Sequence, residues 1–489
     1  MKFSDYSTIY SIPDKMILKV LHLMLLLPVC DSISWHEGCL CELTNQDTLS
    51  LEQNKIFDTQ HFRHGRKISQ FCPCSISSIQ KLNAVHISPT LGALLSTPFF
   101  RYFRVDLEAK CPFWENDGYC TIKQCSVEET QEEEAANVLG TAVLTRASGH
   151  ELIDEHWTNE LDSSWTNEGE NGNFHYVDLL SNPEKYTGYT PKAGSSRVWH
   201  EVHAFNTFHS SSEKIGVVGH EGEESAKELA SMPVEHRVFW KSVSGLHASI
   251  SSHIAVNYLL DKRKEVWGLD LNEFQRRLVD HPDRINNLHF VFLLELRAVA
   301  ILGDFLLHTE HPLSTGHPSE DRQTVKLLQN LVKTKRQWPV SFEEETAFHG
   351  DPNHHLLEIF RTKMYNISRI MDCVGCQRCR LWGKLQMMGL GTALRILYSP
   401  DREEVLRGLH RSHIVALFNA VGRLSHSVEA TRLVVPLLSQ VETNVLGTET
   451  EYRGDEDEDQ PTMQQQRYGE HMFSFNTNEL TKRSGFHGI

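Results

Sequence analysis

The sequence predicts a mainly α-helical fold, organised as a single large helical domain. Apolar residues recur at three-to-four spacing in several long segments, whereas the period-two alternation typical of strands is almost absent. The predicted helices cover residues 224–262, 271–280, 285–308, 356–370, 375–398 and 412–442. A chain of 489 residues can also bury a sizeable core without metals or disulfide staples.

The first 34 residues have the order of a secretory signal peptide. Lys2, Lys15 and Lys19 precede an apolar run at 20–29, and small and polar residues follow it. The run is too short to span a bilayer comfortably, although an uncleaved signal anchor remains the alternative. Since no second stretch comes near spanning length, we expect a soluble lumenal or secreted protein.

The remaining chain divides by composition into four parts. A cysteine-rich segment at 35–127 precedes an acidic flexible loop at 128–173, a helical core at 174–443 and a disordered acidic tail at 444–489. Residues 285–308 are apolar nearly all round, which is typical of a helix in the middle of a bundle. Glu295 and Arg297 within that helix would need partners.

The charge balance opposes binding to nucleic acid. The chain has 48 Lys and Arg against 64 Asp and Glu, a formal net charge of −16. A negative surface repels phosphate backbones, so nucleic acid is excluded as a general partner.

Ten of the eleven cysteines lie beyond the predicted signal, and an even number in an oxidising compartment favours disulfides. No cysteine lies between Cys125 and Cys373. Disulfides that only stabilise a fold would be spread more evenly along the chain. The crowding therefore indicates that some of these cysteines take part in a reaction.

The sharpest motif is Cys376-Gln377-Arg378-Cys379, which follows Cys373 and opens a predicted helix. A Cys-x-x-Cys pair at a helix start places two sulfurs on one face. The helix dipole and nearby arginines favour the thiolate, as in a reversible redox disulfide. A purely structural bridge is the main alternative. Zinc would need a fourth ligand at suitable spacing, and an iron–sulfur cluster a fourth cysteine soon after Cys379.

Two further cysteine sets are less specific. Cys120 and Cys125 follow a polar, turn-prone segment at 116–119. This indicates an exposed, flexible pair that can meet a protein substrate. A local structural bridge fits the sequence equally well. Cys39, Cys41, Cys72 and Cys74 are most simply two nested bridges, worth ~3 kcal/mol or somewhat more by chain-entropy estimates.

Several runs resemble the endoplasmic reticulum oxidoreductin family. They are CPFW at 111–114, KYTGYTP at 185–191, SGLHASI at 244–250, ELRA at 295–298 and the long run NISRIMDCVGCQRCRLWGKLQMMGLGTALRILYS at 366–399. The last run is highly specific, and the resemblance covers most of residues 37–440.

The resemblance implies a helical fold with FAD held in a four-helix bundle core. Cys376 and Cys379 would be the active disulfide beside the isoalloxazine ring. Cys120 and Cys125 would be the shuttle pair on a mobile loop, taking electrons from reduced protein disulfide isomerase. The implied structural bridges are Cys111–Cys373, Cys39–Cys74 and Cys41–Cys72.

The positions that match the family's FAD contacts are Lys185, Thr187, Trp199, Ser244, His247, Arg277 and Arg284. Arg277 and Arg284 can neutralise a pyrophosphate, while Trp199 and His247 can stack on rings. Lys185 stands where the family usually has arginine, so the contact keeps its charge but loses the bidentate fork. The extra cysteines of several animal members are missing, and the segment between Cys41 and Cys72 is longer than usual.

The function implied is an FAD-dependent thiol oxidase of the endoplasmic reticulum lumen, which reoxidises protein disulfide isomerase and passes electrons to molecular oxygen, giving hydrogen peroxide. The alternatives are a non-catalytic, disulfide-stapled lumenal adaptor and an inactive paralogue that retains FAD. Peripheral membrane association is left open. Asn366 begins an Asn-Ile-Ser sequon, which we expect to be glycosylated.

Overall fold

The computed structural model describes residues 76–113, 123–130, 174–186, 234–309, 313–315, 317–338, 347–348 and 355–451. The predicted signal peptide, the nested cysteines Cys39, Cys41, Cys72 and Cys74, the shuttle cysteine Cys120, and the candidate flavin contacts Thr187 and Trp199 lie outside the described residues. Most of the predicted acidic loop and most of the predicted tail also lie outside the described residues.

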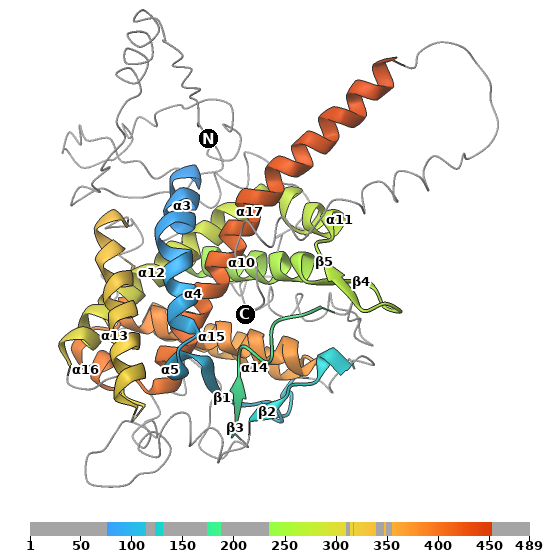
Figure 1. Cartoon of the computed structure of the whole chain (residues 1–489). Coiled ribbons are helices and arrows are strands. Elements are labelled where there is room, and N and C mark those ends of the chain that lie inside the picture. Colours follow the sequence, from blue (N-terminus) through green and yellow to red (C-terminus); the bar gives the residue numbers. More distant parts are fainter. Residues whose placement is uncertain are drawn as a thin grey trace, which may run out of the picture.

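Helices dominate the described chain, which confirms the predicted fold class (Figure 1). The N-terminal helices are α3 (Ile76–Leu82), η1 (Asn83–Ile87), α4 (Ser88–Leu95) and α5 (Pro98–Arg101), and the short η2 is Lys123–Cys125. The central helices are α10 (Val234–Val256), α11 (Leu271–Phe274), η3 (Gln275–Val279), α12 (Pro282–His308), α13 (Pro318–Lys333) and η4 (Thr334–Gln337). The C-terminal helices are α14 (His355–Ile370), η6 (Met371–Cys373), α15 (Gln377–Tyr398), α16 (Arg402–Arg407) and α17 (Arg411–Glu451).

The core is made by α10, α12, α15 and α17, which pack against one another. Two glycines allow the closest approaches. A Cβ on Gly245 of α10 would lie 2.2 Å from the carbonyl oxygen of Asn287 in α12, and one on Gly389 of α15 would lie 2.4 Å from Ala420 Cβ in α17. The lack of a side chain at these two positions therefore sets the distance between the paired helices.

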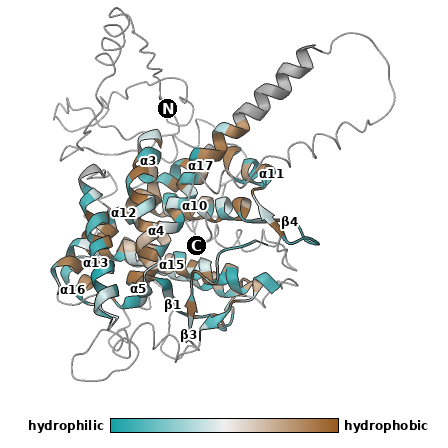
Figure 2. Cartoon of the chain, viewed as in Figure 1, coloured by the Kyte–Doolittle hydropathy of each residue, from teal (hydrophilic) through white to brown (hydrophobic). Residues whose placement is uncertain are grey.

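The central helix α12 is buried over most of its length, as its apolar sequence predicts. It begins at Pro282, three residues earlier than expected, because proline fits the first helical turn, where its missing N–H would lack a partner anyway. Apolar residues gather where α4, α5 and α17 meet, whereas the tip of the β4–β5 hairpin is hydrophilic (Figure 2).

Two small sheets accompany the helices. One joins β1 (Tyr102–Asp106), β3 (Phe174–Asp178) and β2 (Glu129–Thr130) in the order β1-β3-β2, and the other is a hairpin of β4 (Tyr258–Asp261) and β5 (Val266–Gly268). All pairings are antiparallel. Residues 129–130 thus form a strand that pairs with β3, whereas the sequence predicts that they belong to a loop over 128–173.

Two predicted helix ends differ from the structure. The helix expected over 224–262 ends at Val256, because residues 258–261 pair with β5 and Tyr258 forms a bridge with Tyr186. The last helix reaches Glu451 rather than ending near 442. The helix continues through Gly447 into a polar sequence, where the apolar pattern that predicts the helix has already ended. No described helix is both long and apolar enough to cross a membrane.

Candidate active site

Cys376 and Cys379 lie on the first turn of α15. The chain leaves η6 at Cys373, is extended at Val374, and re-enters a helix with Cys376 as the N-cap residue. The amide of Arg380 donates to the carbonyl of Cys376 over 2.8 Å, which fixes this first turn. Cys376 is buried and Cys379 is half-buried, and both are thiols in the structure. The structure therefore shows the dithiol form of the pair for which the sequence predicts a reversible disulfide.

The two thiols differ in acidity. A hydrogen bond from Cys379 lowers the pKa of Cys376, with help from backbone amides of the helix start and the charge of Arg378. The same hydrogen bond, burial, and the charges of Cys376 and Glu184 raise the pKa of Cys379 well above its ordinary value, while Arg423 opposes them. Cys376 is consequently the more readily formed thiolate, and Cys379 retains its proton.

A disulfide anchors the chain directly before the cysteine pair. Cys111 and Cys373 are joined with an S–S distance of 1.97 Å, the pairing that the resemblance implies. Arg380 reinforces the turn by donating through Nε to the Val374 carbonyl over 2.9 Å and through Nη1 to the Leu107 carbonyl. The start of α15 is thereby tied to the N-terminal segment.

The segment that carries Cys125 docks on the same turn. Arg378 Nε donates to the Ser126 carbonyl over 2.9 Å, and the Val127 amide donates to Gln377 Oε1 over 3.2 Å. The Asn182 side chain completes the anchoring by bonding both the amide and the carbonyl of Glu128, at 2.7 and 2.9 Å.

Cys125 itself is buried, with 5% of its surface exposed, and is disulfide-bonded. The prediction of an exposed cysteine is wrong for Cys125, because the polar side chains of α15 hold its segment against the protein. The partner cysteine lies outside the described residues, where Cys120 is the partner implied by the resemblance.

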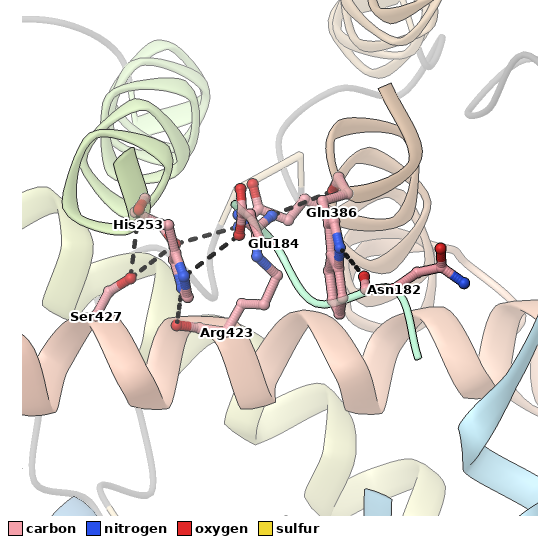
Figure 3. A network of polar contacts seen from close by, with 8 residues as sticks. Asn182, Glu184, His253, Gln386, Arg423 and Ser427 are labelled. Carbon is pink, nitrogen blue, oxygen red and sulfur yellow. Dashed lines mark hydrogen bonds and ion pairs between the residues drawn. The ribbon is translucent and has the colours of Figure 1, made fainter. Parts of the chain in front are cut away.

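A largely buried cluster of titratable residues includes Glu184 and Arg423, whose charges act on the Cys379 thiol. We call Glu184, His253, Arg423 and His426 the Glu184 cluster, and Figure 3 shows the first three of them. Arg423 Nη2 forms an ion pair with Glu184 Oε2, and His253 Nδ1 lies 3.3 Å from the same oxygen. His253 Nε2 lies 3.1 Å from the Arg423 carbonyl oxygen. The members come from the segment after β3, from α10 and from α17.

Trp382 links this cluster to the cysteine helix. Arg423 Nη1 donates to the Trp382 carbonyl over 3.2 Å, and its guanidinium lies 5.3 Å from the Trp382 ring centroid. The indole N–H donates to the Asn182 carbonyl over 2.9 Å, two residues before Glu184. Since Trp382 lies one turn after Cys379, Glu184 and Arg423 are held against the turn that carries the redox pair.

Burial dominates the acidities within the Glu184 cluster. Desolvation raises the pKa of Glu184 to about 7, although the charge and hydrogen bond of Arg423 act in the opposite direction. The pKa of His253 falls well below its ordinary value because of burial and the nearby charges of Arg423 and His426. A carboxyl group whose pKa lies near neutral pH, and whose charge acts on the Cys379 thiol, is the type of group that active sites use.

Four of the matched flavin positions lie on α10, η3 and α12, with the two on α10 near the middle of that helix. Ser244 and His247 lie on α10, Arg277 on η3 and Arg284 at the start of α12. Asn287 Nδ2 donates to Ser244 Oγ over 3.0 Å, and Arg284 Nη1 donates to the Arg277 carbonyl over 2.8 Å. Arg277 also pairs with Glu273 over 2.5 Å.

Lys185 lies apart from those four, beside the β4–β5 hairpin. Its ammonium is 5.1 Å from the Trp267 ring centroid, and the next residue, Tyr186, is hydrogen-bonded to the backbone of Asn257 and Leu259. Lys185 also directly follows Glu184, so it lies by the C-terminal end of α10, next to the Glu184 cluster.

The polar atoms between the Glu184 cluster and the pair Arg277 and Arg284 fit a flavin. The arginine pair offers N–H donors for a pyrophosphate, and a row of α10 side chains leads from Ser244 to His253. Gln386 Nε2 donates to Ser249 Oγ over 3.1 Å, while Gln386 Oε1 is buried without a partner among the described residues. Such an orphaned acceptor in the core fits a polar ring that carries N–H donors.

Five residues of the site were not predicted from the sequence, namely Glu184, His253, Gln386, Arg423 and His426. Arg423 had a usable signal, because it is a charged residue inside the apolar segment 412–442, where a buried arginine needs a carboxylate partner.

The predicted glycosylation site lies on a helix. Asn366 is in α14 with a half-buried side chain, and Ser368 of the same sequon is buried. Its glycosylation stays a prediction.

Comparison with known proteins agrees with this geometry. The family model described as Endoplasmic Reticulum Oxidoreductin 1 matches residues 86–431. Endoplasmic reticulum oxidoreductin-2 of Arabidopsis thaliana is 37% identical over 396 residues, covering 76% of this chain and 79% of the relative. ERO1-like protein alpha of Rattus norvegicus is 34% identical over 423 residues, covering 76% and 90%.

The solved structures that resemble this chain belong to the same family. The structure described as "Ero1p, Source of Disulfide Bonds for Oxidative Protein Folding in the Cell" is 26% identical, has a TM-score of 0.57 and covers 76% of this chain and 99% of its own. A double cysteine-to-alanine mutant of S. cerevisiae Ero1p is 28% identical with a TM-score of 0.53, and the coverage is again 76% and 99%. The chain therefore belongs to the endoplasmic reticulum oxidoreductin family, and its role is that of an oxidoreductase in oxidative protein folding.

Proposed function

We propose that the protein is an FAD-dependent thiol oxidase of the endoplasmic reticulum lumen that reoxidises protein disulfide isomerase. The observation that carries this proposal is the docking of the Cys125 segment on the turn that holds Cys376 and Cys379. A disulfide brought beside a dithiol can exchange with it without a large movement of the core.

The relay consists of thiol–disulfide exchanges. A thiolate of the reduced isomerase attacks the Cys120–Cys125 disulfide, and the second isomerase thiol completes the exchange, leaving an oxidised isomerase and a Cys120/Cys125 dithiol. A thiolate of that dithiol then attacks the Cys376–Cys379 disulfide at Cys376, so that Cys379 departs as the leaving thiolate. The second shuttle thiol then resolves the mixed disulfide, which restores the Cys120–Cys125 disulfide and leaves a Cys376/Cys379 dithiol. Each exchange forms one S–S bond and breaks one.

Arg423 contributes to this relay as a fixed positive charge that favours the thiolate form of Cys379. Lys185, Thr187, Trp199, Ser244, His247, Arg277 and Arg284 would hold FAD, with the arginine pair at its pyrophosphate. When bound there, FAD would take the electron pair from the Cys376/Cys379 dithiol and pass it to molecular oxygen, giving hydrogen peroxide.

The test is oxygen consumption by the purified full-length protein with reduced isomerase. Cys376→Ala and Cys379→Ala should each abolish oxygen uptake while the flavin absorbance band remains, because they remove the redox pair and leave the flavin contacts intact. Arg407→Ala, which breaks an exposed ion pair on α16, is the matched control and should keep full activity.

Full oxygen uptake in either cysteine variant would refute the proposed relay. Purified protein without a flavin band would instead favour a lumenal adaptor that uses its cysteines only as staples.

A further inference from the structure

Gln386 holds an unsatisfied amide oxygen in the core between α10, α15 and α17. The residue lies in the middle of α15 and is 1% exposed. Its Nε2 donates to Ser249 Oγ of α10 over 3.1 Å, whereas its Oε1 is buried and has no partner among the described residues. Leaving an amide acceptor buried without a hydrogen bond costs free energy, so this oxygen indicates a place where a bound group donates.

Two serines fix the direction in which the Gln386 amide points (Figure 3). Ser427 Oγ donates to the Ser249 carbonyl oxygen over 3.4 Å, so the single hydrogen of the Ser427 hydroxyl is used. The 3.0 Å contact between the two hydroxyls then uses the hydrogen of Ser249. With no hydrogen left, Ser249 Oγ can only accept from Gln386. The NH₂ group of Gln386 therefore stays towards Ser249, and Oε1 faces the other way.

Gln386 also lies on the face of α15 that carries Cys379. The two residues are seven positions apart in one uninterrupted helix, which is close to two full turns, so their side chains leave α15 on the same side. Their Cα atoms are about 10 Å apart along the helix axis. Because helical side chains lean towards the N-terminus, the Gln386 amide leans towards the redox pair. A planar group of three fused rings can therefore lie along this face and reach both residues.

We propose that Gln386 orients the flavin ring, with Oε1 accepting a hydrogen bond from the ring N–H and Ser249 holding the amide in place. The inference rests on the proposed function, since it concerns the same flavin site. The oxidised ring system carries one N–H, at N3 of its pyrimidine edge, and its opposite edge is a dimethylbenzene without donors. A single acceptor at a fixed position therefore distinguishes the two ends of the ring system.

The consequence is a fixed direction of the ring relative to Cys379. When Gln386 binds the pyrimidine edge, the polar end of the ring system is kept on the face of α15 that carries the redox pair. Gln386 takes up no proton and no electron, so it is a positioning residue rather than a catalytic one. Ser249 acts one contact further away, through the orientation of the Gln386 amide.

The test compares the binding of FAD and of N3-methyl-FAD, in which a methyl group replaces the ring N–H, to the full-length protein. The parent protein should bind the analogue more weakly, because the analogue leaves Oε1 without a donor. Gln386→Leu has no acceptor, and its shorter side chain leaves room for the methyl group. The ratio of the two dissociation constants should therefore fall by about tenfold. A residue that only fills the core would change both dissociation constants alike and leave their ratio unchanged.

A spectroscopic measurement accompanies the binding ratio. Raman bands of bound FAD that involve N3–H bending shift with the strength of the hydrogen bond to N3–H, so they should differ between the parent and Gln386→Leu. Gln329→Leu is the matched control, because it makes the same substitution at an exposed position of α13. This control should keep the ratio and the spectrum of the parent.

A ratio in Gln386→Leu equal to that of the parent would overturn the inference. If that variant fails to fold or to bind flavin, Ser249→Ala decides. Loss of the Ser249 hydroxyl frees the Gln386 amide to turn, so the ratio should fall in this variant too. A folded Ser249→Ala protein with an unchanged ratio would overturn the inference as well.

Failure of this inference is distinguishable from failure of the proposed function. If the purified parent protein has no flavin band and binds no FAD, the proposed function itself is wrong. If FAD binds, Cys376→Ala and Cys379→Ala abolish oxygen uptake, and the ratio does not depend on Gln386, only the role of Gln386 is wrong.

Discussion

Arg378 joins three parts of the site through a single side chain. Its guanidinium donates to the carbonyls of Ser126 and Pro183, while its charge helps to lower the pKa of Cys376. Because the Ser126 contact is to backbone, it holds the Cys125 segment whatever the side chains of that segment are. A residue between Cys376 and Cys379 thus also holds the segment that carries Cys125.

Arg378→Ala should loosen residues 126–130 from α15. The contact to the Ser126 carbonyl is lost, so amide hydrogen exchange in this segment should accelerate on the order of tenfold, and Cys125 should become easier to reduce. Exchange followed by mass spectrometry checks this expectation. Arg407→Ala should leave the segment protected, and unchanged exchange in Arg378→Ala would show that other contacts hold it.

At the residue scale, the position of Cys376 and Cys379 at a helix start could be predicted from sequence, because the two are close in the chain. The Glu184 cluster could not, since its members lie at 184, 253, 423 and 426 and meet only when α10, α15 and α17 pack. The burial of Cys125 was missed for the same reason. Its polar surroundings in sequence gave no indication of the α15 side chains that cover it.

At the scale of the element, α12 carries a buried acid at the centre of the bundle. Glu295 is fully buried, and neither carboxyl oxygen has a partner among the described residues. Burial raises the pKa of Glu295 well above its ordinary value, so the folded protein holds a proton that the unfolded chain releases. The sequence had already marked this residue as one that needs a partner.

Glu295→Gln should therefore change how stability depends on pH. With the folded pKa raised above the unfolded value of 4.5, the folded state binds more protons over the interval between them. The free energy of unfolding then falls as pH rises through that interval, by up to about 1.4 kcal/mol per pH unit. Glutamine removes this slope.

Denaturant titrations at about pH 5 and pH 8 measure the effect. The variant should gain stability relative to the parent at the higher pH. Parallel curves for the two proteins would mean that Glu295 is charged, or solvated, in the folded state.

The long helices were predictable because their periodicity is local. The small sheet β1-β3-β2 was not, since its strands are far apart in sequence and each is short. The end of α10 at Val256 is likewise set by the pairing of the following residues with β5 and Tyr186, which no local pattern shows.

At the scale of the whole molecule, the Cys111–Cys373 disulfide joins two distant parts of the described chain. It bridges residues separated by 262 positions and lies directly before the redox pair. The start of α15 thereby depends on a covalent link to the N-terminal part of the chain, in addition to the packing of α15 against α17.

The double variant Cys111→Ser with Cys373→Ser should lower the free energy of unfolding by about 2–4 kcal/mol, because the unfolded chain is no longer cross-linked. Denaturant midpoints of parent and variant measure this. Serine at a single remote exposed position, such as Lys262→Ser, is the control. A midpoint equal to that of the parent would show that packing alone fixes the start of α15.

The central claim is that the dithiol at the start of α15 gives its electron pair to a bound flavin. Anaerobic mixing with reduced protein disulfide isomerase, followed by flavin absorbance, tests it most directly. The parent protein should bleach, whereas Cys379→Ala should keep its colour and stay unbleached. Bleaching of Cys379→Ala at the parent's rate would contradict the claim.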